Sequence, residues 1–308
     1  MKNNADVKIA VLIATYNGER FVKEQIISIM SQSITPKQII VTDDHSNDKT
    51  YLILSALHKK YKNINISKNK YRYKSAAKNF INLLRNVNLN EYDYIALSDQ
   101  DDIWKKYKLE EAVKRLENGF DAYSSNVEAF WENGQRQILV KNQPFQKFDH
   151  LFESAGPGCT FVLNKKFVLK LQQFLNKSHF RQVDNYHDWL IYAFARSHNF
   201  NWYIDSYPSV NYRQHSTNVF GANVGKKAFL SRVNRVLLGE GVDFAFQLMK
   251  ELKIQDSFIR SLFPMSRFNL LRLAFKAKCC RRRPREQFFF FIACILLAVI
   301  FPKKLRDF

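Results

Sequence analysis

The residues of this 308-residue chain best suited to chemistry are three closely spaced carboxylates, Asp99, Asp101 and Asp102. They follow an apolar run, residues 92–97, and precede a charged segment with a helical pattern, residues 105–117. Buried carboxylates this close repel one another unless a cation lies among them. An Asp-x-Asp pair at a strand end can hold Mg²⁺ or Mn²⁺ together with substrate phosphates. The alternative is a polar turn that caps the next helix, and Asp102 is the carboxylate for which we expect that role.

The segments around this motif alternate between two patterns. Apolar runs, typical of strands covered on both faces, occupy residues 8–14, 38–42 and 92–97, and residues 63–67 have a weaker strand pattern. Amphipathic segments with helical spacing occupy residues 19–33, 51–61 and 75–87. This alternation predicts βαβ units and an α/β fold with a mostly parallel sheet. Ligands of such sheets collect at the carboxyl ends of the strands, so we expect three polar turns to converge on one crevice: residues 15–17, 43–44 and 99–101.

A nucleotide in this crevice would have to be held by side chains and a metal ion. The first strand is not followed by the GxGxxG of a Rossmann dinucleotide site, and the chain has no GxxxxGK[ST] of a P-loop. The composition, 46% hydrophobic and 25% charged, is that of a globular protein and excludes a disordered or fibrous one.

Six segments of the chain carry the pattern of one family. They are TYNGERFVKEQIISIMSQS, VTDDHSNDKT, ALSDQDDIW, GPGCTFVLN, YHDWLIYAFA and NYRQHSTNVFG, in this order. The first three resemble family 2 glycosyltransferases with the GT-A fold, a Rossmann-like sheet flanked by helices. The last three resemble more narrowly the bacterial rhamnosyltransferase-type members, which build cell-surface polysaccharides. The resemblance covers residues 7–221 and implies a GT-A domain, residues 1–221, with a nucleotide-sugar half, 1–104, and an acceptor half, 105–221.

The resemblance implies a metal-dependent, inverting glycosyltransferase of the hexosyltransferase class. The implied reaction moves L-rhamnose from dTDP-rhamnose to a cell-surface or lipid-linked saccharide, commonly one on undecaprenyl diphosphate. No motif recognises a 6-deoxy sugar directly, so a UDP-hexose donor stays open. Two less favoured alternatives are a nucleotidyltransferase, against which the glycine-poor first turn argues, and a non-catalytic adaptor that binds lipid headgroups.

The resemblance also implies which residues bind the nucleoside of the donor. Thr15, Tyr16, Asn17 and Glu19, in and after the first turn, would line the base and the ribose. Asp44 would accept a hydrogen bond from the base, a role that suits a carboxylate because it accepts without carrying a proton. The alternative for the turn around Asp44 is an N-cap of the following helix, and both roles can hold at once.

Further residues would hold the metal and the diphosphate. By resemblance Asp101 is a direct ligand of Mg²⁺ or Mn²⁺, and Asp99 faces the ribose or reaches the metal through water. His215 is the implied third protein ligand or a diphosphate donor. The planar fork of Arg213 suits phosphate, and Lys78 lies where the family often places a basic residue near the phosphates. A solvated helix lysine is an equally good interpretation of Lys78.

The second half of the chain supplies the implied general base, Asp188. In an inverting transfer one carboxylate takes the proton of the acceptor hydroxyl, and the family places this base at the Asp of the YHDW motif. An acidic residue in a first helical turn also favours the helix dipole alone. The resemblance places the acceptor against two motifs, at Gly156, Gly158, Cys159, Thr160, His187 and Trp189.

The C-terminal extension, residues 222–308, is strongly basic. It holds 18 Lys and Arg against 6 Asp and Glu, so 18 − 6 = +12 of the chain's formal charge of +20 lies there. Residues 288–301 are 14 uninterrupted apolar residues, too few to cross a bilayer comfortably. Flanking basic residues predict a helical extension that lies on an anionic membrane surface. A core helix or a dimer contact is the alternative.

The sequence also indicates which partners, which cysteine state and which cellular location to expect. No RRM, KH, zinc-finger or helix-turn-helix pattern accompanies the charge, so we expect no nucleic-acid partner. The four cysteines have no CxxC spacing and the N-terminus has no secretory pattern, so we expect reduced thiols. Together with the basic extension, this predicts a peripheral or monotopic protein at the cytoplasmic face of a bacterial cell membrane.

Overall fold

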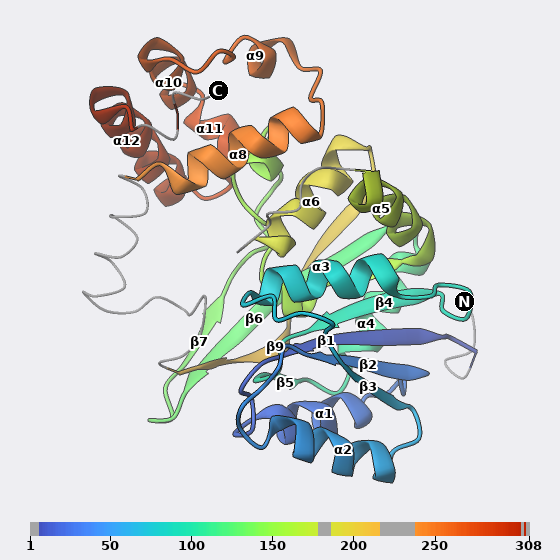
Figure 1. Ribbon diagram of the computed structural model, residues 1–308. Helices are drawn as coiled ribbons and strands as arrows, with labels where there is room; N and C mark the ends of the chain where they lie inside the picture. Colours follow the sequence, from blue (N-terminus) through green and yellow to red (C-terminus); the bar gives the residue numbers. More distant parts are fainter. Residues whose placement is uncertain (1–5, 178–185, 216–237, 303–304, 306–308) are drawn as a thin grey trace. The chain divides into compact units, whose positions relative to one another are not determined.

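The computed structural model of the protein describes residues 6–177, 186–215, 238–302 and 305 (Figure 1). The chain forms two compact units. The first, here called the sheet unit, comprises residues 1–142, 155–191 and 198–217. The second, here called the helical unit, comprises residues 143–154, 192–197 and 218–308.

The predicted parallel strands form one half of the sheet. Their order is β3-β2-β1-β4, and all three pairings are parallel. All seven residues of β1 are buried, because it has a strand on either side and helices on both faces of the sheet (Figure 1). The strands are β1 (Ile9–Thr15), β2 (Gln38–Asp43), β3 (Ile64–Lys68) and β4 (Tyr94–Ser98). The α/β prediction is therefore confirmed.

Helices cover both faces of this half. Ile9, Val11 and Ile13 of β1 pack into a core shared with α1, α2 and α4. The intervening residues of β1 point to the opposite face, where α3 packs on β1 and α5 packs on α3. The bounds are α1 (Val22–Met30), α2 (Thr50–Lys60), α3 (Ala76–Asn86), α4 (Lys108–Glu117) and α5 (Lys165–Lys177).

The other half of the sheet is mixed. β8 lies antiparallel between β4 and β6, and β9 lies parallel to β6. β5 and β7 are antiparallel additions to β9 and β6. The bounds are β5 (Ile103–Trp104), β6 (Ala122–Trp131), β7 (Arg136–Leu139), β8 (Val162–Asn164) and β9 (Trp202–Gln214). β9 is 13 residues long, and its far end returns to the acidic residues that follow β4.

Two short elements link the acceptor motifs to this sheet. A 3₁₀ turn, η2 (Gly158–Thr160), precedes β8, and α6 (His187–Ser197) begins at the predicted base motif. The buried residues of α6 include Trp189, Leu190 and Ile191.

The helical unit contains η1 (Asp149–Leu151), α8 (Glu240–Glu251), α9 (Ser257–Arg260), α10 (Arg267–Ala274), α11 (Ala277–Cys280) and α12 (Pro284–Ile300). The predicted apolar run forms most of α12, which is 17 residues long. Among the described residues, no helix combines the length and the apolar character that crossing a membrane requires. All four cysteines are free thiols, as predicted.

A buried ion-pair network holds the helical unit together. Asp149 is fully buried and accepts hydrogen bonds from Arg196 at 3.2 Å and from the Tyr192 hydroxyl at 3.1 Å. Arg282 lies 3.7 Å from Asp149 and 3.4 Å from Glu153, with its side chain 1% exposed. The prediction that the whole basic cluster reaches lipid headgroups is therefore wrong for Arg282, because buried carboxylates engage it.

Candidate active site

The Gln100 side chain forms two hydrogen bonds with the backbone of the turn that follows β1. Its side-chain amide donates to the carbonyl oxygen of Tyr16 at 3.0 Å, and its side-chain oxygen accepts from the Tyr16 N–H, also at 3.0 Å. A Cβ on Gly18 would lie 2.3 Å from that oxygen, so a larger residue there would displace the Gln100 side chain. The acidic loop, defined as residues 99–102, is thus hydrogen-bonded to the first turn, as the predicted convergence requires.

Asn17 and Glu19 join the first turn to the second. The side-chain oxygen of Asn17 accepts from the N–H of Asn47 at 2.9 Å, and the Glu19 carboxylate accepts from the N–H of Lys49 at 2.8 Å. The buried Thr15 hydroxyl donates to a carboxylate oxygen at the end of β2, 3.2 Å away. These contacts hold the two turns together, and nucleoside binding by the three residues stays a prediction.

Asp44 anchors the segment that follows β3. One of its oxygens accepts from the N–H of Tyr73 at 2.7 Å and from the Asn69 amide at 3.0 Å. The other accepts from the N–H of Lys74 at 2.8 Å. The predicted base acceptor is therefore a buried, fixed carboxylate beside the first turn.

Arg72 belongs to the same segment and was missed in the sequence. Its guanidinium lies 4.6 Å from the centroid of the Tyr16 ring and also donates to the Tyr16 hydroxyl. The available signal was four cations at alternate positions of residues 68–74, just past a predicted strand end. Arg72 therefore joins the candidate donor-binding residues.

Asp101 and His215 are in direct contact. Nε2 of His215 lies 2.8 Å from Oδ2 of Asp101. Both side chains keep some exposure, 10% for His215 and 16% for Asp101. β9 carries His215 back to the acidic loop across more than a hundred residues of sequence, so the structure brings together two of the predicted metal ligands.

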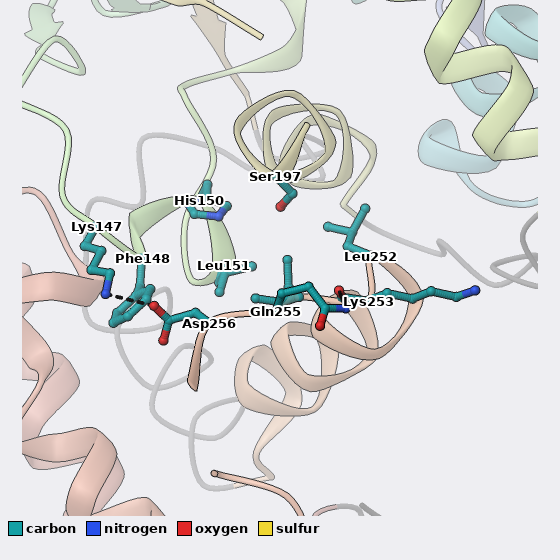
Figure 2. A pocket seen from close by; sticks show the side chains of 10 residues that line it. Lys147, Phe148, His150, Leu151, Ser197, Leu252, Lys253, Gln255 and Asp256 are labelled. Carbon is teal, nitrogen blue, oxygen red and sulfur yellow. Dashed lines mark hydrogen bonds and ion pairs between the residues drawn. The ribbon is translucent and has the colours of Figure 1, made fainter. Parts of the chain in front are cut away.

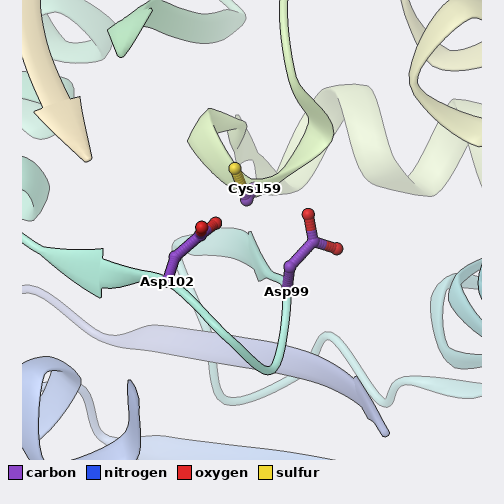
Figure 3. A group of neighbouring side chains, drawn as sticks. All are labelled: Asp99, Asp102 and Cys159. Atoms are coloured by element: carbon purple, nitrogen blue, oxygen red, sulfur yellow. The ribbon is translucent and has the colours of Figure 1, made fainter. Parts of the chain in front are cut away.

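Asp99, Asp102 and Cys159 form an adjoining cluster (Figure 3). Their potential ligand atoms all lie within 4.8 Å of one another. Burial raises the pKa of Asp99 to about 7, and the charges of Asp101 and Asp188 add to this shift. Burial also raises the pKa of Asp102 and of the Cys159 thiol well above their ordinary values. Cys159 therefore stays protonated at neutral pH and directs its S–H toward the two carboxylates.

Asp102 does not cap α4, contrary to the prediction. The helix has Tyr107 at its N-cap position, with no side-chain cap. Asp102 instead accepts from the N–H of Arg213 at 3.0 Å with one oxygen. Its other oxygen is buried and has no nitrogen or oxygen donor among the described residues. The physical reason is that β5 pairs with β9 directly after Asp102 and separates it from the start of the helix.

Lys108, in the first turn of α4, is fully buried near the same cluster. Its ammonium group lies 3.8 Å from the centroid of the Trp104 ring and donates to the carbonyl of Thr160 at 3.4 Å. Burial lowers the pKa of Lys108 to about 7, and Cys159 and Asp102 act in the opposite direction. Nothing in the sequence distinguishes this lysine from the exposed lysines around it.

Arg213 holds the acidic loop in place. Its Nε donates to the carbonyl of Asp101 at 2.8 Å, and its Nη2 pairs with Glu24. The guanidinium also lies over two rings, 4.6 Å from the centroid of Phe21 and 4.7 Å from that of Phe130. These contacts give Arg213 a positioning role, and its predicted contact with phosphate stays untested.

Asp188, the predicted base, lies in the first turn of α6 against η2. A Cβ on Gly158 would lie 2.6 Å from Nε2 of His187 and 3.4 Å from Cβ of Asp188. The Asp188 carboxylate also contributes to the raised pKa of Asp99. The structure thus brings the predicted base, one acceptor glycine and the acidic loop into one neighbourhood.

His187 is held as a neutral ring. It stacks on Phe80 with ring centroids 4.5 Å apart and planes 18° from parallel. Burial lowers the pKa of His187 to about 3. Its Nε2 is buried and has no hydrogen-bond partner among the described residues.

The structure also describes the other predicted residues. Gly156 has a φ of 140°, which favours glycine, and the buried Thr160 hydroxyl donates to a neighbouring carbonyl at 2.8 Å. Trp189 is buried, and Lys78 is half-buried in the first turn of α3. The part of the last family motif at residues 216–221 lies outside the described residues.

The donor set fits a hard divalent cation. Asp99, Asp101 and the orphaned oxygen of Asp102 offer carboxylate ligands, and His215 offers an imidazole. The protonated thiol of Cys159 serves as a hydrogen-bond donor to the carboxylates rather than as a ligand. The residues present therefore fit a divalent cation such as Mg²⁺ or Mn²⁺.

A separate pocket of about 260 Å³ lies in the helical unit between residues 147–151 and 252–256 (Figure 2). The Lys147 ammonium and the Asp256 carboxylate, 2.8 Å apart, pair at its edge. None of the predicted site residues lines this pocket. It is therefore distinct from the acidic cluster.

Sequence comparisons agree with this geometry. The chain matches the model of the family described as "Glycosyl transferase family 2" over residues 10–172. The dTDP-rhamnosyl transferase RfbG of Shigella flexneri is 41% identical over 227 residues, which are 73% of this chain and 78% of the relative. The UDP-Glc:alpha-D-GlcNAc-diphosphoundecaprenol beta-1,3-glucosyltransferase WfgD of Escherichia coli is 26% identical over 188 residues, 60% of this chain and 69% of the relative.

A solved structure shares the fold. The mannosyltransferase PcManGT from Pyrobaculum calidifontis, in complex with GDP-Man and Mn²⁺, aligns with a TM-score of 0.52 and 13% sequence identity. The alignment covers 97% of this chain and 87% of that one. At this identity the likeness concerns the fold alone.

Proposed function

Because the chain belongs to the family 2 glycosyltransferases, enzymes that use nucleotide-sugar donors, we propose that it transfers L-rhamnose from dTDP-rhamnose. The observation that carries the donor assignment is the 41% identity to a dTDP-rhamnosyl transferase over 73% of this chain. The proposed donor site comprises Thr15, Tyr16, Asn17, Glu19, Asp44 and Arg72 for the nucleoside, with Lys78 toward the diphosphate.

The proposed mechanism is a single displacement with inversion. Asp188 takes the proton of the acceptor hydroxyl as its oxygen forms a bond to the anomeric carbon. The bond from that carbon to the diphosphate oxygen breaks on the opposite face, and dTDP leaves. Support for this role comes from the closeness of Asp188 to Asp99, which brings the proposed base near the acidic loop.

Asp101, His215 and Asp99 would hold the divalent cation beside the diphosphate. The bound ion would act as a Lewis acid that offsets the charge developing on the leaving group. Arg213 positions these ligands through the Asp101 carbonyl, and the neutral Cys159 thiol orients the carboxylates behind them. The solved complex of PcManGT, which shares the fold, contains Mn²⁺ and agrees with this proposal.

We further propose a lipid-linked saccharide as the acceptor, and the cytoplasmic face of the cell membrane as the location. Support comes from the name of WfgD, whose acceptor is a diphosphoundecaprenol-linked sugar, and from the basic, apolar extension. Gly156, Gly158, Cys159, Thr160, His187 and Trp189 are the proposed acceptor-side residues.

The test is a donor panel. Purified protein is mixed with Mg²⁺ or Mn²⁺ and with dTDP-rhamnose, UDP-glucose or UDP-N-acetylglucosamine, and thermal stabilisation and donor turnover are measured with and without EDTA. We expect metal-dependent stabilisation and turnover with dTDP-rhamnose. Stabilisation by the UDP donors alone would replace the rhamnose assignment by a UDP-hexose donor, the second candidate, which the name of WfgD favours.

A further inference from the structure

The helical unit exposes large apolar side chains on two neighbouring helices. On α10 and the residue that follows it, Phe268 is 69% exposed and Phe275 is 80% exposed. On α12, Phe288 is 62% exposed and Val299 is 68% exposed. Contiguous exposed apolar surface of this kind marks an interaction site in soluble proteins.

The two helices form one surface. The rings of Phe275 and Phe291 meet edge to face with centroids 5.9 Å apart. Nη1 of Arg267 donates to the carbonyl of Ala298 at 2.8 Å and also to that of Val299. We call this surface, formed by exposed residues of 267–276 and 284–300, the α10–α12 face.

The exposed residues of α12 follow one side of the helix. The exposed large apolar residues are Phe288, Phe289, Ile292, Leu296, Val299 and Ile300, each three or four residues from another of them. The opposite side, with Phe290, Cys294 and Leu297, is buried in the unit. This division suits a helix that lies flat against its partner along its whole length.

The charge around this face identifies the partner. Residues 267–300 contain eight Lys or Arg and one Glu. Arg282 is buried in the Asp149 network, whereas Lys276, Lys278 and Arg285 are exposed. Two copies of the face would bring like charges together, whereas an anionic lipid surface offers both apolar depth and negative headgroups.

We propose that the α10–α12 face docks on an anionic lipid surface, with Phe268, Phe275, Phe288 and Val299 entering the interface and Lys278 and Arg285 at the headgroups. The proposal rests on the proposed function only in that a lipid-linked acceptor requires the enzyme at a membrane. It specifies which helices bind, which side of α12 faces the lipid, and that α10 takes part.

The test is sedimentation of the full chain with vesicles of phosphatidylcholine, alone or mixed with phosphatidylglycerol. We expect binding to the anionic vesicles that weakens with salt. Phe275→Ser with Phe288→Ser should lower partition roughly a hundredfold, and Lys278→Gln with Arg285→Gln should lower it about fivefold per charge. Exposed residues of the sheet unit serve as matched controls, Ile27→Ser with Leu52→Ser and Lys59→Gln with Lys62→Gln, and should leave partition unchanged.

Several outcomes would overturn the proposal: equal binding to neutral vesicles, equal losses in the control variants, or unchanged partition in the face variants. A dimer in light scattering that Phe275→Ser abolishes, with vesicle binding unaffected, would assign the face to a second copy instead. Donor stabilisation by dTDP-rhamnose is measured on the same samples without vesicles. If vesicle binding is absent and donor binding is intact, this inference alone is overturned. If vesicle binding is intact and dTDP-rhamnose does not bind, the proposed function alone is overturned.

Discussion

Buried carboxylates in the two units differ in what balances their charge. In the helical unit, burial alone would raise the pKa of Asp149, but hydrogen bonding by His150 and the charges of Arg196 and Arg282 hold it below its ordinary value. In the sheet unit, burial raises the pKa of Asp99 to about 7, and neighbouring carboxylates add to the shift. Among the described residues, arginines offset the charge of Asp149, whereas no cation is among the groups that shift the pKa of Asp99.

This is the difference expected between a structural acid and a functional one. A buried acid supplied with arginine partners stabilises the fold and needs nothing from outside. Buried acids with strongly perturbed pKa values cluster at functional sites, and a divalent cation would supply the missing charge here. Substitutions that exchange an acid for its amide in each region therefore test the comparison directly.

The largest effect is expected for Asp188→Asn. An amide does not accept the proton of the acceptor hydroxyl, so the transfer rate should fall by roughly 10²–10⁴-fold. The measurement is the rate of saccharide product formation under saturating donor and metal.

Donor affinity and thermal stability of this variant are the controls. Both should stay near wild type, because Asp188 lies on the acceptor side of the proposed site. A variant that keeps its transfer rate would remove Asp188 from the role of base, and one that loses donor binding as well would indicate a structural role.

Asp149→Asn should have the largest effect on stability. The substitution leaves Arg196 and Arg282 buried beside a neutral amide, and breaking such a pair costs about 3–5 kcal/mol. Urea unfolding followed by circular dichroism at neutral pH measures the loss. Donor binding per folded molecule should be unchanged, since Asp149 belongs to the helical unit.

Asp102→Asn, the same exchange in the acidic loop, should act in the opposite direction in metal-free protein. The pKa of Asp102 is raised in the folded state, so the folded protein holds a proton that the unfolded chain has released, and stability falls as pH rises above about 4. The amide does not titrate, so it removes this loss of stability at high pH. The unfolding free energy should therefore rise by on the order of 1 kcal/mol at pH 8. The gain should vanish as pH falls below about 3, where the carboxyl is protonated in both states, and a loss at pH 8 would break the comparison with Asp149.

Much of the donor half was predictable because its signals are local. Strands covered on both faces are continuous apolar runs, so residues 8–14, 38–42 and 92–97 were recognisable, and the polar turns after them had to meet at one sheet edge. The closeness of residues 99–102 to the first turn follows from that topology. The family resemblance added the roles that spacing alone left open.

The features that were missed depend on distant partners. β9 continues past Asp205 and Pro208, which carry no strand signal, because β6 pairs in parallel with residues 202–205 and 210–214, on either side of an irregularity that contains Pro208. Arg282 belongs to a basic run that suggested headgroup contact, and only the buried Asp149 reveals its structural role. Lys108 likewise has the sequence context of a solvated helix residue.

The last prediction concerns His187, whose pKa is moved by burial alone among the described residues. Burial lowers the pKa of His187 to about 3 from an ordinary 6.5, so below pH 6.5 the unfolded chain binds a proton that the folded chain does not. Stability should therefore fall as pH drops from 6.5 toward 4, and His187→Phe, which keeps the stacking on Phe80, should fall less. Urea midpoints of both proteins at pH 7.5 and pH 5 give the comparison. Equal losses of stability in the two proteins would show that His187 is protonated in the folded state. The surrounding residues would then balance its charge, as they do for Asp149.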